Sequence, residues 1–114
     1  MLYNVTERGP EFDLLPELKA HDIPTMAYSP IAQGRLPHAP ALAKIAAGHG
    51  VTSFQIALAW TLRDPTVIAI PKASDEDHVR QNRRAADLAL TAEDLAETDR
   101  EFPPPKRKTR LAML

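Results

Sequence analysis

The sequence predicts an α/β fold in which parallel strands are joined by crossover helices. Short apolar runs that suit strands alternate with longer segments of helical periodicity, which is the pattern of parallel α/β proteins. The run at residues 67–70 is apolar at every position, as a strand covered on both faces requires. Only two good runs of this kind are present, and two strands cannot bury both faces of a sheet. The sequence therefore implies neighbouring strands beyond those it contains.

One helix and one strand are expected before residue 30. Asp13 is placed to cap a short helix that runs to about His21, with its leucines on one face. The apolar run Ile23–Tyr28 fits a short buried strand. The residues from Pro30 to Pro40 contain glycine and proline and show no periodicity. They predict a loop of the length that is usually functional or disordered in compact domains.

Two consecutive helices are expected after this loop. Pro40 suits the first turn of a helix that ends at the glycines of the stretch Gly48–Gly50. Thr52 followed by Gln55 has the capping-box spacing and opens a second helix at Phe54–Arg63. Because the second helix is apolar on most sides, we expect neighbours to pack against most of it.

A strand at Val67–Ile70 and two polar helices are expected in the rest of the chain. Each helix follows a hydroxyl residue that has an aspartate three positions later, again the capping-box spacing. The expected ranges are 74 to about 86, capped by Ser74 with Asp77, and 91 to about 100, capped by Thr91 with Asp94. Residues 103–114, rich in proline and lysine at their start, predict an extended tail.

Composition limits the classes of function. The chain has 114 residues and a formal net charge of -1, so one modest domain is expected and the basic excess of a nucleic-acid binder is missing. The absence of cysteine excludes disulfide scaffolds and thiol catalysis, and His21, His38 and His49 are too scattered to predict a metal site. No apolar run approaches the ~20 residues of a membrane span. We therefore expect a cytoplasmic protein without nucleic-acid or membrane partners.

Three segments in order, with matching spacing, resemble the aldo-keto reductase family. They are Ile23–Gly34, similar to the family's seventh strand and following loop; Val51–Trp60, similar to its G-x-T-P-A-Q-V-A-L-x-W helix; and Ile70–Asn82, similar to its I-P-K-S…R-x-x-E-N segment. The resemblance implies the C-terminal portion of a (β/α)8 TIM barrel, from about the end of the sixth strand onward. Residues 1–114 would then form a partial reductase domain, with 103–114 as its tail.

The resemblance also implies an NADP(H) site. Tyr28 matches the tyrosine that stacks on the nicotinamide, and Lys72 matches the lysine that pairs with the 2′-phosphate, which favours NADPH over NADH. His78 stands where many members have arginine, a departure that gives a weaker and pH-dependent cation. The remaining implied contacts are Ser29, Ile31 and Gln33 for the pyrophosphate, Ala73 and Ser74 for the phosphate at a helix N-terminus, and Gln81 and Asn82 for the adenine.

A complete member of this family would transfer a hydride from NADPH to an aldehyde or ketone, giving an alcohol. The family's catalytic Asp, Tyr, Lys and His match no residue of this chain, so no catalytic residue is assigned and we expect the chain alone to be inactive. Open sheet edges should favour self-association.

Two non-enzymatic alternatives are a partner-binding remnant and a helix-turn-helix DNA-binding module at residues 42–62. The DNA-binding alternative is disfavoured because the second helix would offer few polar side chains to base edges.

Overall fold

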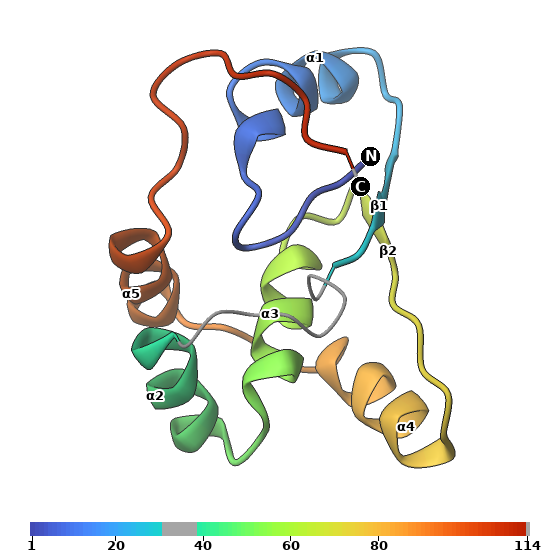
Figure 1. The fold of residues 1–114 in the computed structure, drawn as a ribbon, viewed down its shortest axis with the longest axis vertical. Coiled ribbons are helices and arrows are strands. Elements are labelled where there is room, and N and C mark those ends of the chain that lie inside the picture. The colour runs from blue at the N-terminus through green and yellow to red at the C-terminus, as the bar shows by residue number, and fades with distance from the viewer. Residues whose placement is uncertain (31–38, 114) are drawn as a thin grey trace.

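The computed structural model describes residues 1–30 and 39–113. Helices and strands alternate along the described chain in the expected order (Figure 1). The elements are a 3-10 turn η1 (Gly9–Glu11), α1 (Leu14–Ala20), β1 (Thr25–Tyr28), α2 (Pro40–His49), α3 (Ser53–Thr61), β2 (Val67–Ile70), α4 (Glu76–Ala85) and α5 (Ala92–Glu101). Residues 103–113 follow α5 without a helix or strand. Among these described helices, none has the length and apolar character needed to cross a bilayer.

The two strands are parallel neighbours, as the sequence predicted. Their register pairs Thr25 with Val67 and Tyr28 with Ile70, and α2 and α3 form the connection between them. The N-terminal segment runs along the other edge of β1. Its terminal amine at Met1 donates to the Met26 carbonyl at 2.9 Å, and the Tyr28 amide donates to the Met1 carbonyl at 3.0 Å. Three extended segments therefore lie side by side.

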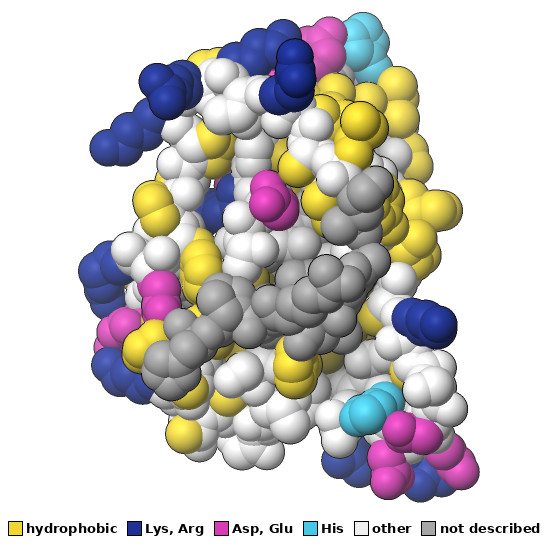
Figure 2. All heavy atoms as spheres, viewed as in Figure 1, with side chains coloured by type: hydrophobic (Ala, Val, Ile, Leu, Met, Phe, Trp, Pro, Cys, Tyr) yellow, Lys and Arg dark blue, Asp and Glu magenta, His cyan; other side chains and the backbone are white. Residues whose placement is uncertain are grey.

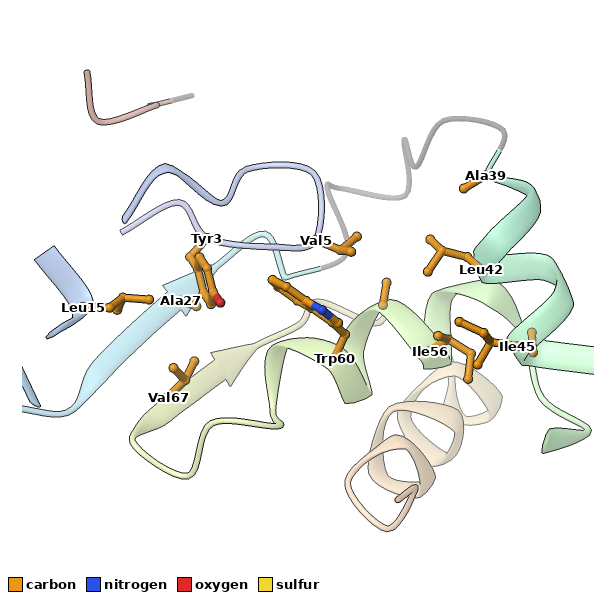
Figure 3. Close-up of a cluster of buried hydrophobic side chains, with 12 residues drawn as sticks. Tyr3, Val5, Leu15, Ala27, Ala39, Leu42, Ile45, Ile56, Trp60 and Val67 are labelled. Carbon is orange, nitrogen blue, oxygen red and sulfur yellow. The ribbon is translucent and has the colours of Figure 1, made fainter. Parts of the chain in front are cut away.

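The core lies between the strands and the helices of the crossover. Residues Gln55 to Thr61 of α3 are all buried, and Trp60 is completely enclosed. Figure 3 shows the Trp60 indole beside Tyr3, with a ring-centroid separation of 5.6 Å. The guanidinium of Arg63 stacks on the same indole, 3.6 Å from the ring centroid. This burial confirms that α3 packs on most of its sides, and it argues against the helix-turn-helix alternative.

A buried guanidinium joins the two ends of the described chain. Arg8 is 9% exposed, lies 5.0 Å from the Trp60 ring centroid and donates two hydrogen bonds of 2.8 Å to Glu11. It also donates to Asp99 at 2.7 Å and to the Phe102 carbonyl at 2.6 Å. Because Arg8 is charged and hardly exposed, these charge-assisted bonds are needed to offset its desolvation. The N-terminal segment is thereby tied to the end of α5.

One face of the sheet is open to the surface. The side chains of Met26, Ile68 and Ile70 are about half exposed, whereas the buried positions Ala27 and Val67 face the core. Figure 2 shows hydrophobic atoms gathered where β1 and β2 reach the surface. The strands alternate their side chains between two faces, and the described helices cover one of those faces only. The open face agrees with the expectation that two strands alone cannot bury both faces of a sheet.

Capping hydrogen bonds follow the sequence at two helices. Thr52 accepts from the Gln55 amide at α3, and Thr91 accepts from the Asp94 amide at α5, each with the reciprocal side-chain bond of a capping box. The expected cap of α4 is wrong. Asp75, not Ser74, accepts from the first-turn amide, and α4 begins at Glu76. Both residue types can cap, so the pattern alone did not decide between two neighbouring positions.

Two smaller expectations about helix ends also need correction. Asp13 precedes α1 as expected but makes no capping hydrogen bond, and its carboxylate lies 3.4 Å from Lys108 of the tail. Gly48 lies inside α2, and the helix ends at Gly50, whose φ of 69° is the left-handed conformation that glycine tolerates best.

Candidate functional site

The candidate site lies at the carboxyl ends of β1 and β2. Because the strands are parallel and Tyr28 pairs with Ile70, the segments that follow both residues leave the sheet at the same edge. This edge is where ligands bind in α/β proteins with parallel sheets. Tyr28 is half-buried at the end of β1, and Lys72 is exposed two residues after the end of β2. The fold thus brings two predicted cofactor residues from distant parts of the sequence to one edge.

Ser29 is held by a residue that the sequence analysis did not single out. Asn4 is 1% exposed, and its Nδ2 donates to the Ser29 carbonyl at 2.9 Å. Its Oδ1 accepts from the amide and hydroxyl of Thr6 at 2.9 and 2.8 Å and from the Glu7 amide at 3.0 Å. Ser29 has a positive φ of 52°, which is uncommon for a residue with a side chain. Asn4 therefore fixes the unusual turn that follows Tyr28.

The segment after β2 leads to the start of α4. Ala73 is half-buried, Ser74 is exposed, and neither is in a helix or strand. Asp75 Oδ1 accepts from the His78 amide at 2.9 Å, which leaves the amides of Glu76 and Asp77 without an acceptor among the described residues. Free first-turn amides and the helix dipole favour an anion at this end.

Charges of both signs surround this helix end. The His78 Nδ1 lies 2.8 Å from Asp75 Oδ2, and both side chains are more than half exposed. Glu76 pairs with Arg80, and Asp77 is exposed on the same first turn. Figure 2 shows this mixture of histidine, acidic and basic side chains over α4. The amides would attract a phosphate, whereas the three carboxylates would reduce that attraction.

Gln81 and Asn82 lie in the second turn of α4 and are half-buried. The Gln81 carbonyl accepts a hydrogen bond of 3.1 Å from the Nε2 of Gln55 in α3. The capping-box spacing places Gln55 at the start of α3, but nothing in the local pattern indicates this second bond. The other two predicted cofactor residues, Ile31 and Gln33, lie outside the described residues.

The titratable groups with shifted pKa values stabilise the surrounding fold. Burial opposes the ionisation of Asp94, but hydrogen bonds from His49 and Thr91 outweigh it and hold the pKa of this carboxyl below its usual value. Burial raises the pKa of Tyr3. These residues join segments of the scaffold, and none of them is a predicted cofactor residue.

Comparison with known proteins decides the family. The sequence model of the Aldo/keto reductase family matches residues 1–101. The chain belongs to this family. It is 40% identical to methylglyoxal reductase YeaE of Escherichia coli, covering all of this chain and 42% of that reductase. It is 34% identical to pyridoxine 4-dehydrogenase of Escherichia coli, covering 85% of this chain and 34% of that enzyme.

Solved aldo-keto reductase structures are similar to the whole chain. An aldo-keto reductase from Klebsiella pneumoniae, in complex with NADPH, is 47% identical with a TM-score of 0.95, and the match covers 100% of this chain and 42% of that one. The chain thus spans less than half the length of the relatives it matches. Its α/β fold is that of a portion of the aldo-keto reductase (β/α)8 barrel.

Proposed function

We propose that this chain forms the NADP(H)-binding part of an aldo-keto reductase that converts an aldehyde or ketone to an alcohol. The observation that carries the proposal is the match of the whole chain to an NADPH-bound reductase at 47% identity and a TM-score of 0.95. Tyr28 and Lys72, at one edge of the parallel sheet, support it. In the reaction the reduced nicotinamide supplies the hydride to the carbonyl carbon, and a proton goes to the carbonyl oxygen.

Each predicted residue would have a role that its position suits. The half-buried ring of Tyr28 would stack on the nicotinamide, and the turn held by Asn4 at Ser29 would direct the chain across the pyrophosphate. Lys72 would pair with the 2′-phosphate next to the free first-turn amides of α4. The free amides at the start of α4, the aromatic ring of Tyr28 and the ammonium group of Lys72 together suit a phosphorylated dinucleotide.

The charges around α4 support only a modest preference for NADPH over NADH. Lys72 and, when protonated, His78 would attract the 2′-phosphate, while Asp75, Glu76 and Asp77 lie on the same helix end and repel it. A 2′-phosphate bound here would gain most from the lysine, because its flexible stem can reach away from the carboxylates.

The test compares cofactor binding by Lys72→Ala with binding by the unsubstituted chain. We expect Lys72→Ala to weaken NADPH binding by about 1–3 kcal/mol, the scale of a lost charge-assisted bond, and to leave NADH binding nearly unchanged. Lys106→Ala, which removes an exposed lysine of the tail, is the matched control and should alter neither. Equal losses of NADPH and NADH affinity would show that Lys72 does not contact the 2′-phosphate.

We further propose that the chain alone binds cofactor without turnover and self-associates. None of its residues matches the family's catalytic set, and the half-exposed Met26, Ile68 and Ile70 form an apolar surface next to the outer edge of β2, which pairs with no further strand among the described residues. Measuring its size in solution and its NADPH-dependent reduction of simple aldehydes tests both statements. A monomer with turnover above background would contradict them. The alternative of a non-catalytic partner-binding protein would be favoured if no nicotinamide cofactor binds.

A further inference from the structure

Gln55 joins two helices through a single amide group. It lies in the first turn of α3, and the residue is 6% exposed. Its Oε1 accepts from the Thr52 amide at 3.0 Å, which closes the capping box of α3. Its Nε2 donates to the Gln81 carbonyl of α4 at 3.1 Å. The oxygen of the Gln55 amide thus forms a hydrogen bond at the start of α3, and its nitrogen forms one with α4.

Helix α4 packs against α3 but buries few of its own side chains. Ala85 is the one buried residue of its ten, and the segment from Pro71 to Asp75 that leads into it contains no helix or strand. Ala85 lies four positions after Gln81, so the buried side chain and the bonded carbonyl are on the same side of the helix. One buried apolar side chain, with Gln81 and Asn82 only half-buried, fixes the rotation of α4 about its axis weakly. The hydrogen bond from Gln55 adds the second point that fixes this rotation.

We propose that Gln55 is a positioning residue for the adenine end of the cofactor. By fixing the rotation of α4, it sets the direction in which Gln81 and Asn82 present their side chains. This inference rests on the proposed function, in which those two residues contact the adenine.

The chemistry of the capping box supports a role beyond α3. A capping box accepts glutamate as well as glutamine, because only the side-chain oxygen is used. A carboxylate at this position would still accept from the Thr52 amide. It would have no proton to donate to the Gln81 carbonyl and would place two oxygen acceptors against each other. The need for an amide rather than an acid at residue 55 therefore comes from α4.

The test separates the two bonds with a pair of substitutions. Gln55→Glu keeps the acceptor for the Thr52 amide and loses the donor to α4. Thr52→Ala removes the hydroxyl that caps α3 and leaves the bond between Gln55 and Gln81 in place. The dissociation constant for adenosine 2′,5′-bisphosphate, measured by isothermal titration calorimetry, and the Tm are determined for both variants and the unsubstituted chain.

The two variants should differ in their affinity for the bisphosphate. We expect Gln55→Glu to bind the bisphosphate about tenfold more weakly, equivalent to about 1.4 kcal/mol, and to lower the Tm as well, because it places a carboxylate at a buried position. Thr52→Ala should lower the Tm and change the affinity less than about twofold, which is under 0.5 kcal/mol. Should Gln55→Glu fail to fold, Gln55→Met removes the donor without adding a charge and should weaken binding similarly.

A pH series adds a readout that a purely structural role would not produce. At low pH the carboxyl group introduced by Gln55→Glu gains a proton that it can donate to the Gln81 carbonyl. The ratio of its dissociation constant to that of the unsubstituted chain should therefore fall towards one between about pH 8 and about pH 5.

Three results would overturn the inference. Unchanged affinity in Gln55→Glu and Gln55→Met would overturn it while leaving the proposed function intact. Losses of affinity that follow the loss of Tm equally in Gln55→Glu and Thr52→Ala would do the same. Failure of the unsubstituted chain to bind the bisphosphate would overturn the proposed function and this inference with it.

Discussion

Substitution of Asn4 tests whether a buried amide in the N-terminal segment holds the turn after Tyr28. Asn4→Ala removes all four side-chain hydrogen bonds, one donated to the Ser29 carbonyl and three accepted from Thr6 and Glu7. Asn4→Asp keeps an oxygen for the three donors and loses only the bond to Ser29. Comparison of the two variants therefore separates the stability that Asn4 gives to its own turn from the stability that comes from its bond to Ser29.

The expected magnitudes follow from the number of bonds. A hydrogen bond contributes about 1 kcal/mol net, so we expect Asn4→Ala to lower the free energy of unfolding by about 4 kcal/mol. Asn4→Asp loses one bond and leaves an acceptor facing the Ser29 carbonyl, which should cost about 2 kcal/mol. Because that carbonyl directly follows Tyr28, Asn4→Asp should also weaken NADPH binding.

Urea unfolding followed by tryptophan fluorescence measures these losses. Trp60 is the one tryptophan of the sequence and is completely buried, so its emission should respond to unfolding. These separate contributions would be refuted if Asn4→Ala lowered the free energy of unfolding by less than about 1 kcal/mol. They would also be refuted if the two substitutions lowered it equally, because the bonds to Thr6 and Glu7 would then contribute nothing beyond the bond to Ser29.

Three further predictions concern the scaffold. Arg8→Met should lower the free energy of unfolding by about 3 kcal/mol, because the partly buried carboxylate of Glu11 loses two charge-assisted hydrogen bonds and keeps, of its described partners, only Tyr3 and Arg63. Asp99→Asn, at a half-exposed partner, should cost about 1 kcal/mol or less. Similar costs of the two substitutions in urea unfolding would contradict this. The pKa of Asp94 is lower in the folded chain than in the unfolded one, so this carboxylate stabilises the fold at neutral pH. This contribution should be lost as the pH falls below about 4. In His49→Gln the free energy of unfolding should fall less steeply with falling pH over that range. Gly50→Ala should lower the free energy of unfolding, measured by thermal unfolding, by about 1 kcal/mol. The cause would be the φ of 69° alone, because the added methyl group would meet no other described part of the chain within 4 Å. An unchanged Tm would argue against a left-handed helix end.

Local signals in the sequence predicted the elements well. The capping boxes at Thr52 and Thr91 involve residues three positions apart, so both partners are visible in one short stretch. The order of strands and helices follows from periodicity in the same way. At α4, where Ser74 and Asp75 are both good caps, the local signal was ambiguous and the prediction was wrong by one residue.

The support of the candidate site could not be read from the sequence in the same way. Asn4 bonds a carbonyl 25 residues away, Gln55 bonds one 26 residues away, and Arg8 reaches Asp99 across 91 residues. In the sequence these three residues resemble ordinary turn, cap or surface residues, because their partners are far away along the chain. The resemblance to aldo-keto reductases indicated which residues would face the cofactor, but it did not indicate what holds them in place.

The sparse attachment of α4 bears on how fast a cofactor could leave. Seven consecutive residues of α3 are buried, which makes local opening of α3 costly, whereas Ala85 is the one fully buried side chain of α4 and Gln55 bonds this helix to α3. Local opening of α4 should therefore occur far more often than global unfolding, and its amides should exchange with solvent sooner. A dinucleotide whose adenine lies against this helix would be released at the rate at which α4 opens. The residence time of the cofactor would then depend on a helix that carries none of the chemistry.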